Sequence, residues 1–248
     1  MKSLQVEIWS DVVCPWCYIG KRRFEAALAA FKQRDGVEVR WRSFQLDPQA
    51  PQASEKTIVE MLAGKYGMSL ERAAAANARV SKLAAQEGLE YHLELAHPEN
   101  TFNAHRLIHL ADKRGLQDAM EERLMRAYFT EGQRVGEIET LVRLASEVGL
   151  DAEEARAVLV GDTHAEEVRS DEREAHLLGI TGVPFFVINE KYGISGAQPT
   201  EVFSKVLEQV WSETHPLIRV SAGPDEESAC EGDSCAISSR QIPGMGIQ

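Results

Sequence analysis

The feature that most restricts this sequence is a pair of cysteines between a strand pattern and a helix pattern. Residues 4–9 alternate in polarity, which predicts a strand. The run Cys14-Pro15-Trp16-Cys17 follows, and apolar residues then recur at helical spacing over residues 18–31. A second alternating run, residues 37–46, predicts another strand. Together they predict a βαβ unit that opens an α/β fold, with the cysteines where its helix begins.

This position suits thiol chemistry. The unpaired N–H groups and the dipole of a helix N-terminus favour a thiolate, which predicts Cys14 as the attacking group. Pro15 fits the first helical position, where its missing N–H is not needed. Cys17 follows about one turn later, close enough to form a disulfide, and is predicted to be the resolving thiol. The basic run Lys21–Arg23 is expected to add positive charge.

Other uses of such a pair are a zinc half-site, which Cys230 and Cys235 could complete, or inert packing. The preceding strand, the internal proline and the following helix favour redox chemistry.

The remaining chain divides by pattern. Residues 53–178 are rich in helix formers, with glycines at helix-sized intervals and no clear strand, which predicts an inserted helical domain. Residues 181–189 predict a buried strand, followed by a short partner strand ending at Ser195 and an amphipathic helix over residues 199–211. We therefore expect residues 1–52 and 179–215 to form one α/β domain around the insertion.

Residues 216–248 are predicted to form a flexible acidic tail. From residue 221 onward it has five acids and one base, a net charge of −4. It also contains Cys230 and Cys235. We favour an auxiliary dithiol that exchanges with the first pair and whose acidic flanks contact Lys21–Arg23. The alternatives are a regulatory disulfide, a metal site and two unrelated thiols.

Charge and composition exclude several partners. The chain has 248 residues, with 27 Lys and Arg against 39 Asp and Glu, so its net charge of −12 is poorly suited to nucleic-acid phosphates. No apolar run approaches the ~18 residues of a membrane span, and no secretory signal is visible. We expect a cytoplasmic protein that binds neither nucleic acid nor membrane. We expect no cofactor and no metal.

Three ordered motifs also resemble a known family. Residues 10–20 (SDVVCPWCYIG), 182–187 (GVPFFV) and 194–198 (ISGAQ) are similar to the DsbA-like thioredoxin-fold oxidoreductases, in particular the FrnE-type cytoplasmic branch. The similarity extends over about residues 4–212. It implies a thioredoxin fold with a large inserted helical subdomain, so that residues 1–52 and 179–215 become its thioredoxin-like domain.

The resemblance also implies substrate contacts. Pro184 would be a cis-proline beside the active cysteines, and the Val183 backbone would pair with a substrate peptide. The sequence by itself equally allows a trans proline at the start of a strand. Trp16, inside the motif, is a third predicted substrate-binding residue. His105 lies in a run that also resembles the family, and we interpret it as structural because a single histidine without a placed partner indicates little.

The predicted function is a thiol–disulfide oxidoreductase, with disulfide isomerase activity as an extension, that acts on protein thiols and disulfides. Glutathione or a thioredoxin-like protein is the expected reductant. One alternative is a glutathione-dependent isomerase or transferase of the hydroxychromene carboxylate isomerase or kappa type, although such relatives usually carry serine in place of Cys14. A third possibility is a zinc-binding redox sensor.

Overall fold

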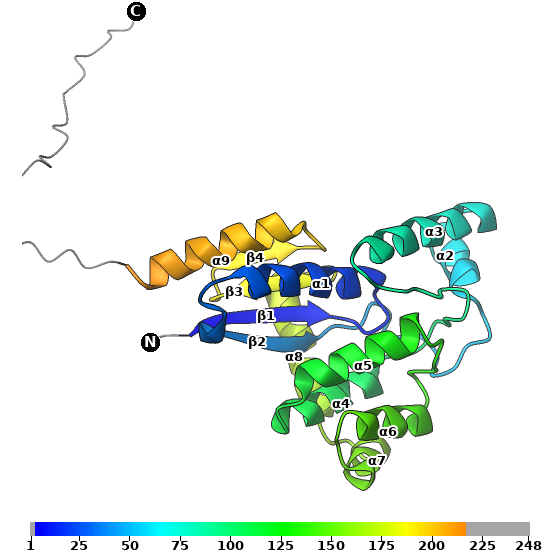
Figure 1. Ribbon diagram of the computed structural model, residues 1–248. Coiled ribbons are helices and arrows are strands. Elements are labelled where there is room, and N and C mark those ends of the chain that lie inside the picture. Colours follow the sequence, from blue (N-terminus) through cyan, green and yellow to red (C-terminus); the bar gives the residue numbers. More distant parts are fainter. Residues whose placement is uncertain (1–2, 217–248) are drawn as a thin grey trace, which may run out of the picture. The chain divides into compact units, whose positions relative to one another are not determined.

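The computed structural model describes residues 3–216. Within this range four strands form one mixed sheet in the order β2-β1-β3-β4 (Figure 1). Strand β1 (Leu4–Ser10) runs parallel to β2 (Val37–Ser43) and antiparallel to β3 (Phe185–Ile188), and β3 pairs antiparallel with β4 (Tyr192–Ser195). This is the predicted thioredoxin-like α/β fold. The proposed tail, with Cys230 and Cys235, lies outside the described residues.

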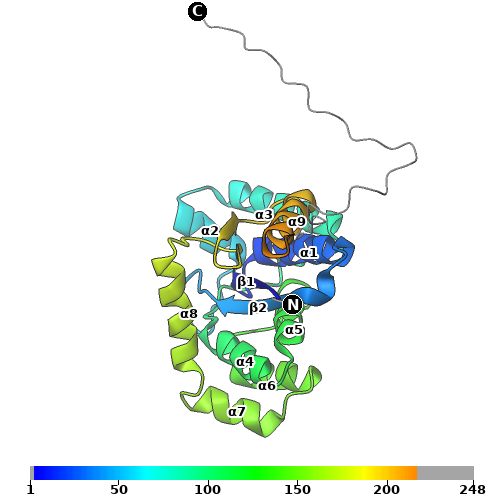
Figure 2. The same cartoon turned by 90° about the vertical axis from the view of Figure 1, so that its left-hand side faces the viewer.

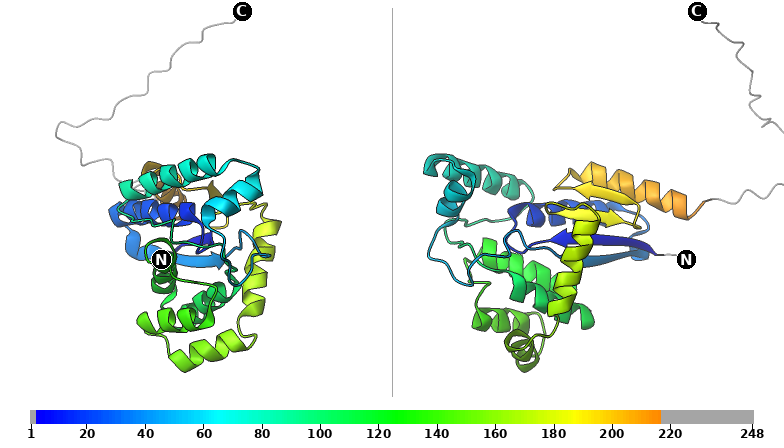
Figure 3. Two further views of the ribbon diagram at one scale, coloured as in Figure 1. Left: turned by 90° about the vertical axis from the view of Figure 1, so that its right-hand side faces the viewer. Right: turned by 180° about the vertical axis from the view of Figure 1, so that it is seen from behind.

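Both faces of the sheet are covered. Leu4, Val6 and Ile8 of β1 are fully buried in the main core, on the side of α1 (Pro15–Ala30) and α9 (Thr200–Thr214). These two helices lie side by side (Figure 1). Trp9 faces the other way, where α8 (Ala165–Leu177) crosses the sheet (Figure 3). The alternating side chains of β1 therefore pack into two different hydrophobic clusters, one on each face of the sheet.

Seven helices, α2 to α8, separate β2 from β3 in the described chain. The α2–α3 hairpin lies on the α1 side of the sheet, and α4, α6 and α7 lie on the other side (Figure 2). Of the described chain, residues 3–215 belong to one compact unit, so the helices are not detached from the sheet. The division into a thioredoxin-like domain and an inserted domain stays a prediction. The bounds of the remaining helices are α2 Ile58–Tyr66, α3 Leu70–Gln86, α4 Phe102–Lys113, α5 Gln117–Phe129, α6 Ile138–Glu147 and α7 Ala152–Val160.

Side chains of α5 and α8 close the outer edge of β2. The Gln117 amide accepts a hydrogen bond from Trp41 N–H (2.9 Å) and donates one to Trp41 C=O (3.0 Å), as a further strand would. Asp171 accepts the Ser43 N–H at 2.9 Å. Unpaired edge groups invite pairing with other chains, and here they are satisfied internally.

Two strands are shorter than the sequence predicted. The second ends at Ser43 rather than at residue 46, because the Asp11 carboxylate takes the Leu46 N–H at 2.7 Å and draws the chain away from the sheet. The third begins at Phe185 rather than at residue 181, because Pro184 has no N–H for the ladder. No helix within residues 3–216 has the length and apolar character needed to cross a bilayer.

Candidate active site

The motif lies where β1 passes into α1. Cys14 is the N-cap in an extended conformation, and Pro15 is the first helical residue. The Cys14 N–H donates to the Asp11 carbonyl (2.9 Å), and the Cys17 N–H donates to the Cys14 carbonyl (3.0 Å). Both cysteines are thiols in the structure and are nearly fully buried. The helix start expected from the sequence is thus present, and it leaves Cys14 at the positive end of the helix dipole.

The late proline loop meets this helix start. The Val183–Pro184 peptide bond is cis, as the family resemblance implied. The Cys14 Sγ donates a hydrogen bond to the Val183 carbonyl at 3.5 Å. Gly20, one turn after Cys17, lies against the Pro184 ring so closely that a Cβ there would be 2.9 Å from Pro184 Cγ. The fold therefore brings Cys14, Val183 and Pro184 together across a separation of 169 residues.

An open cavity of about 320 Å³ begins at Cys14. Trp16 lines this cavity and has 43% of its surface exposed. Met61 and Leu62 of α2 also line the cavity. Phe129 of α5 is also part of the lining. Polar groups are present too: Asp11, Asp47, Lys65, Asn77, Glu99 and Thr101. The Cys14 residue thus lines a mainly apolar space that is large enough to take a side chain of another molecule.

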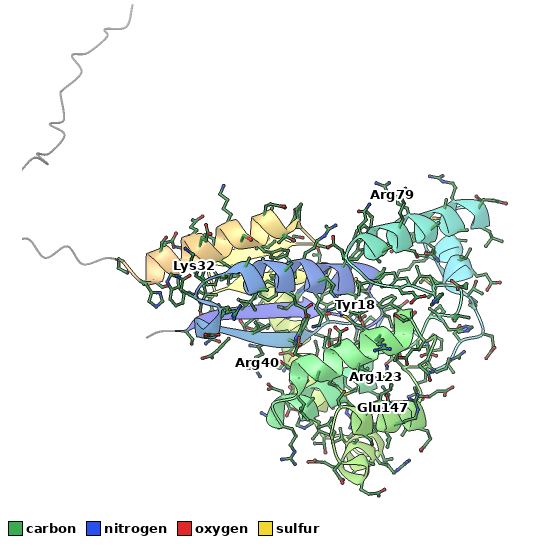
Figure 4. The ribbon with its side chains drawn as sticks, in the orientation of Figure 1. Tyr18, Lys32, Arg40, Arg79, Arg123 and Glu147 are labelled. Carbon is green, nitrogen blue, oxygen red and sulfur yellow. The ribbon has the colours of Figure 1, made fainter. Side chains whose placement is uncertain are left out.

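The other side of the motif is closed. Aromatic rings of Tyr18, Tyr91 and Phe129 pack together beneath it, and the Tyr91 hydroxyl donates to the Pro15 carbonyl at 2.8 Å. Tyr18 extends from α1 toward α5 (Figure 4), where its hydroxyl donates to Glu122 at 2.6 Å. Burial, and to a lesser extent the neighbouring Cys14, raise the pKa of Cys17 well above its usual value. Cys17 is therefore held as a buried, protonated thiol.

A polar cluster lies behind Cys17. The Ser10 hydroxyl at the end of β1 donates to the Glu121 carboxylate of α5 at 2.7 Å. His105 of α4 faces Asp11, with Nε2 3.5 Å from Oδ1. All four residues are about 1% exposed. His105 is therefore buried close to the motif, in the first turns of α4 as expected, yet it faces a carboxylate that the sequence did not suggest.

The basic run after the motif does not present free charge. Lys21 is buried and paired with Glu25, Asp118 and Glu122. Arg22 pairs with Glu25 and Glu122, and Arg23 pairs with Glu87 at 2.6 Å. Carboxylates of the described chain already neutralise all three side chains. The expected contact between this run and the acidic tail lies outside the described residues and stays a prediction.

Comparisons with known proteins agree with this geometry. The family model for the DSBA-like thioredoxin domain matches residues 5–208. The chain belongs to the DsbA-like thioredoxin domain family. Among solved structures, it is 51% identical to a probable DsbA oxidoreductase, SCO1869 of Streptomyces coelicolor, with a TM-score of 0.81 and coverage of 90% of this chain and 97% of that one.

Two further relatives of this DsbA-like chain are more distant. The uncharacterized protein YwbO of Bacillus subtilis is 30% identical over 208 residues, which are 83% of this chain and 96% of YwbO. A structure of the cytosolic disulfide reductase DsbM from Pseudomonas aeruginosa with GSH has 22% identity and a TM-score of 0.59, and covers 84% of this chain and 98% of that one. At that identity DsbM shows the fold only.

Sequence patterns missed the polar side of this DsbA-like site. Ser10, Asp11 and Gly20 stand within the quoted motif, but only as part of the resemblance. Glu121 gave no signal, because it lies in a strongly charged helix typical of a solvent-facing surface. The assignments of Cys14 and Cys17 as catalytic, and of Trp16, Val183 and Pro184 as substrate-binding, stay predictions.

Proposed function

We propose that this protein is a cytoplasmic thiol–disulfide oxidoreductase that acts on protein thiols and disulfides through Cys14 and Cys17. One observation carries the proposal: the Cys14 sulfur, at a helix N-terminus, lies 3.5 Å from the Val183 carbonyl, and Cys14 lines a mainly apolar cavity. A substrate segment beside Val183 would present its sulfur to Cys14, and the cavity would accept a neighbouring apolar side chain.

The reaction follows from exchange chemistry. When the pair is reduced, the Cys14 thiolate attacks a substrate disulfide, and Cys17 then resolves the mixed disulfide and leaves the pair oxidised. When the pair is oxidised, a substrate thiolate attacks Cys14 and a second substrate thiol releases the product. Repeated cycles on one substrate would amount to isomerisation, which is the finer activity we propose.

Glutathione is the proposed small-molecule reductant, with a thioredoxin-like protein as the other candidate. The similarity to DsbM, a disulfide reductase solved with GSH, supports this choice. The FrnE-type branch assignment and the auxiliary role of Cys230 and Cys235 are proposals of the same kind. Deletion of residues 221–248 tests the auxiliary role, because unchanged turnover and redox response would exclude it.

Insulin reduction in the presence of dithiothreitol tests the main proposal. The wild-type protein should accelerate insulin precipitation, and Cys14→Ser should show no acceleration. Activity in Cys14→Ser equal to that of wild type would refute the mechanism. Conjugate formation between glutathione and a small aromatic electrophile is the parallel assay. Turnover there without insulin reduction would favour the glutathione-dependent isomerase or transferase instead.

A further inference from the structure

Aromatic rings line the cavity beside Cys14 from the surface to the interior. Trp16 and Tyr66 are exposed, whereas Tyr128 and Phe129 are almost fully buried. The exposed rings therefore mark the mouth of the cavity, and the buried rings mark its inner end. Aromatic rings pack favourably against one another in offset or edge-to-face arrangements. The lining thus favours a flat, mostly apolar group next to Cys14.

Two buried carboxylates add a polar requirement to this apolar lining. Asp11 and Glu99 also line the cavity and are 1% and 4% exposed. Each uses one oxygen for the backbone, since Asp11 Oδ2 accepts the Leu46 N–H at 2.7 Å and Glu99 Oε2 accepts the Gly136 N–H at 2.8 Å. The other oxygens, Asp11 Oδ1 and Glu99 Oε1, have no hydrogen-bond partner within residues 3–216. Because such buried atoms are costly to leave unpaired, the inner end favours a ligand that donates a hydrogen bond.

The cationic neighbours of these carboxylates indicate that the donor is neutral. Arg134 Nε lies 2.5 Å from Glu99 Oε1 and His105 Nε2 lies 3.5 Å from Asp11 Oδ1, although neither contact has hydrogen-bond geometry. Burial lowers the pKa of His105, but Asp11 outweighs this effect and the pKa is raised. A lysine or arginine ligand would bring a further positive charge close to these groups, and like charges repel. A neutral hydroxyl or N–H group avoids that repulsion.

We propose that this cavity recognises an aromatic side chain with a neutral hydrogen-bond donor, as in tyrosine, next to the reacting cysteine of the substrate. The donor binds the free oxygen of Asp11 or Glu99, which makes these two carboxylates specificity-determining residues. This inference rests on the exchange reaction proposed above and narrows its substrates. Tyrosine combines an apolar ring with one polar group, and so matches both the lining and the carboxylates. Phenylalanine would fill the same space but would leave both oxygens without a partner.

A series of peptide disulfides tests this preference. The peptides share one sequence with X-Cys-X at its centre, where X is tyrosine, phenylalanine or lysine, and each is a symmetric disulfide. The enzyme is the full chain with Cys230→Ser and Cys235→Ser, in its reduced form. Chromatography gives the rate of peptide thiol release, which is divided by the rate of the same peptide with dithiothreitol to correct for intrinsic reactivity.

Tyrosine should give a corrected rate about tenfold higher than phenylalanine, because only its hydroxyl can satisfy a buried carboxylate. Lysine should be slower than tyrosine. Equal corrected rates for tyrosine and phenylalanine would overturn the inference, as would a faster reaction with lysine. If no peptide released a thiol, the exchange reaction itself would be refuted.

Amide variants test the two carboxylates. In Asp11→Asn and Glu99→Gln the amide oxygen can still accept the Leu46 or Gly136 N–H, and an NH₂ group then replaces the free oxygen. The tyrosine-to-phenylalanine ratio should fall toward one in at least one variant, which identifies the acceptor. Asp171→Asn is the matched control, since it replaces a buried carboxylate that contacts β2 instead. An unchanged ratio in both variants would contradict the inference. If neither variant folds, the peptide series alone decides.

Discussion

The two sides of the Cys14–Cys17 motif are built in opposite ways. On the Cys14 side lie a cavity with a mainly apolar lining, the Trp16 ring and the carbonyl of Val183. On the Cys17 side, the thiol is about 1% exposed and lies beside packed aromatic rings and a buried polar cluster, of which Phe129 and Asp11 also line the cavity. An attacking sulfur needs access to a large substrate, whereas a resolving sulfur needs only to reach its neighbour.

Helix α5 accounts for much of this difference. Gln117 completes the edge of β2, Glu121 reaches Ser10, and Glu122 holds Tyr18 and Arg22. Arg123 extends from the same helix to Glu147 of α6 (Figure 4), at 2.7 Å. The closed side is thus supplied by a helix far from the motif in sequence. We expect its residues to control stability, and those of the open side to control substrate contact.

The largest effect should come from replacing the two cysteines one at a time. Cys17→Ser keeps the attacking thiol but removes resolution, so a covalent enzyme–substrate adduct should accumulate and turnover should be lost. Cys14→Ser should form no adduct at that site. Mass spectrometry of protein incubated with a disulfide-containing peptide measures both. Equal adduct formation in the two variants would contradict the asymmetry.

A buried carboxyl on the closed side should make stability depend on pH. Glu121 has a pKa of about 7 in the folded protein, against 4.5 ordinarily. Below pH 4.5 it is protonated in both states and carries no penalty. As the pH rises toward 7 the unfolded chain ionises first, so the free energy of unfolding should fall by about 3 kcal/mol in all.

Urea unfolding of wild type and Glu121→Gln at pH 5 and pH 8 measures this effect. The variant has no such group to ionise, so its stability should change less between the two pH values. The same pH dependence in both proteins would show that Glu121 is not the group responsible.

The edge of β2 should be a purely structural part of the closed side. Gln117→Leu leaves the Trp41 N–H and C=O without their partners, which should cost about 2 kcal/mol of unfolding free energy. Disulfide exchange by the folded variant should stay at the wild-type level. Chemical denaturation and the insulin assay give the two quantities. A parallel loss of exchange activity would mean that α5 acts on the thiols through its backbone as well.

The smallest effect concerns the spacing between the two sides. In Gly20→Ala the new methyl group meets Pro184 Cγ at 2.9 Å, so the loop carrying Val183 must move away from Cys14. We expect exchange to slow about tenfold with little loss of folding, since alanine favours the helix. Gly64→Ala in α2 is the control, because no atom lies within 4 Å of its added carbon. Equal exchange rates in both variants would show that the close contact between Gly20 and Pro184 does not affect exchange.

The open side could be predicted from the sequence far better than the closed one. Strand β1, the start of α1 at Pro15 and the final helix follow from local patterns that no distant contact alters. Val183 and Pro184 came only through resemblance to a family, because no local rule brings a loop 169 residues away to Cys14.

Glu121 shows why the closed side was missed. Its neighbours Glu122 and Arg123 mark the segment as a charged surface helix, and a charged side chain is seldom fully buried. Only the packing of α5 beside β2 turns one of these glutamates inward to Ser10 of β1, and that contact joins residues 111 positions apart. The ion pairs of the basic run Lys21–Arg23 were missed for a similar reason, since Asp118, Glu122 and Glu87 come from elsewhere in the fold and only Glu25 lies in the same helix.

The spacing of the functional side chains on α5 has an evolutionary consequence. Gln117, Glu121 and Glu122 lie on neighbouring turns, and each meets a different partner in the sheet or in α1. Inserting one residue between Gln117 and Glu121 would rotate them about 100° relative to one another and break at least one set of contacts. Natural relatives should therefore change in length between helices and keep this one helix in register, even where its amino acids differ.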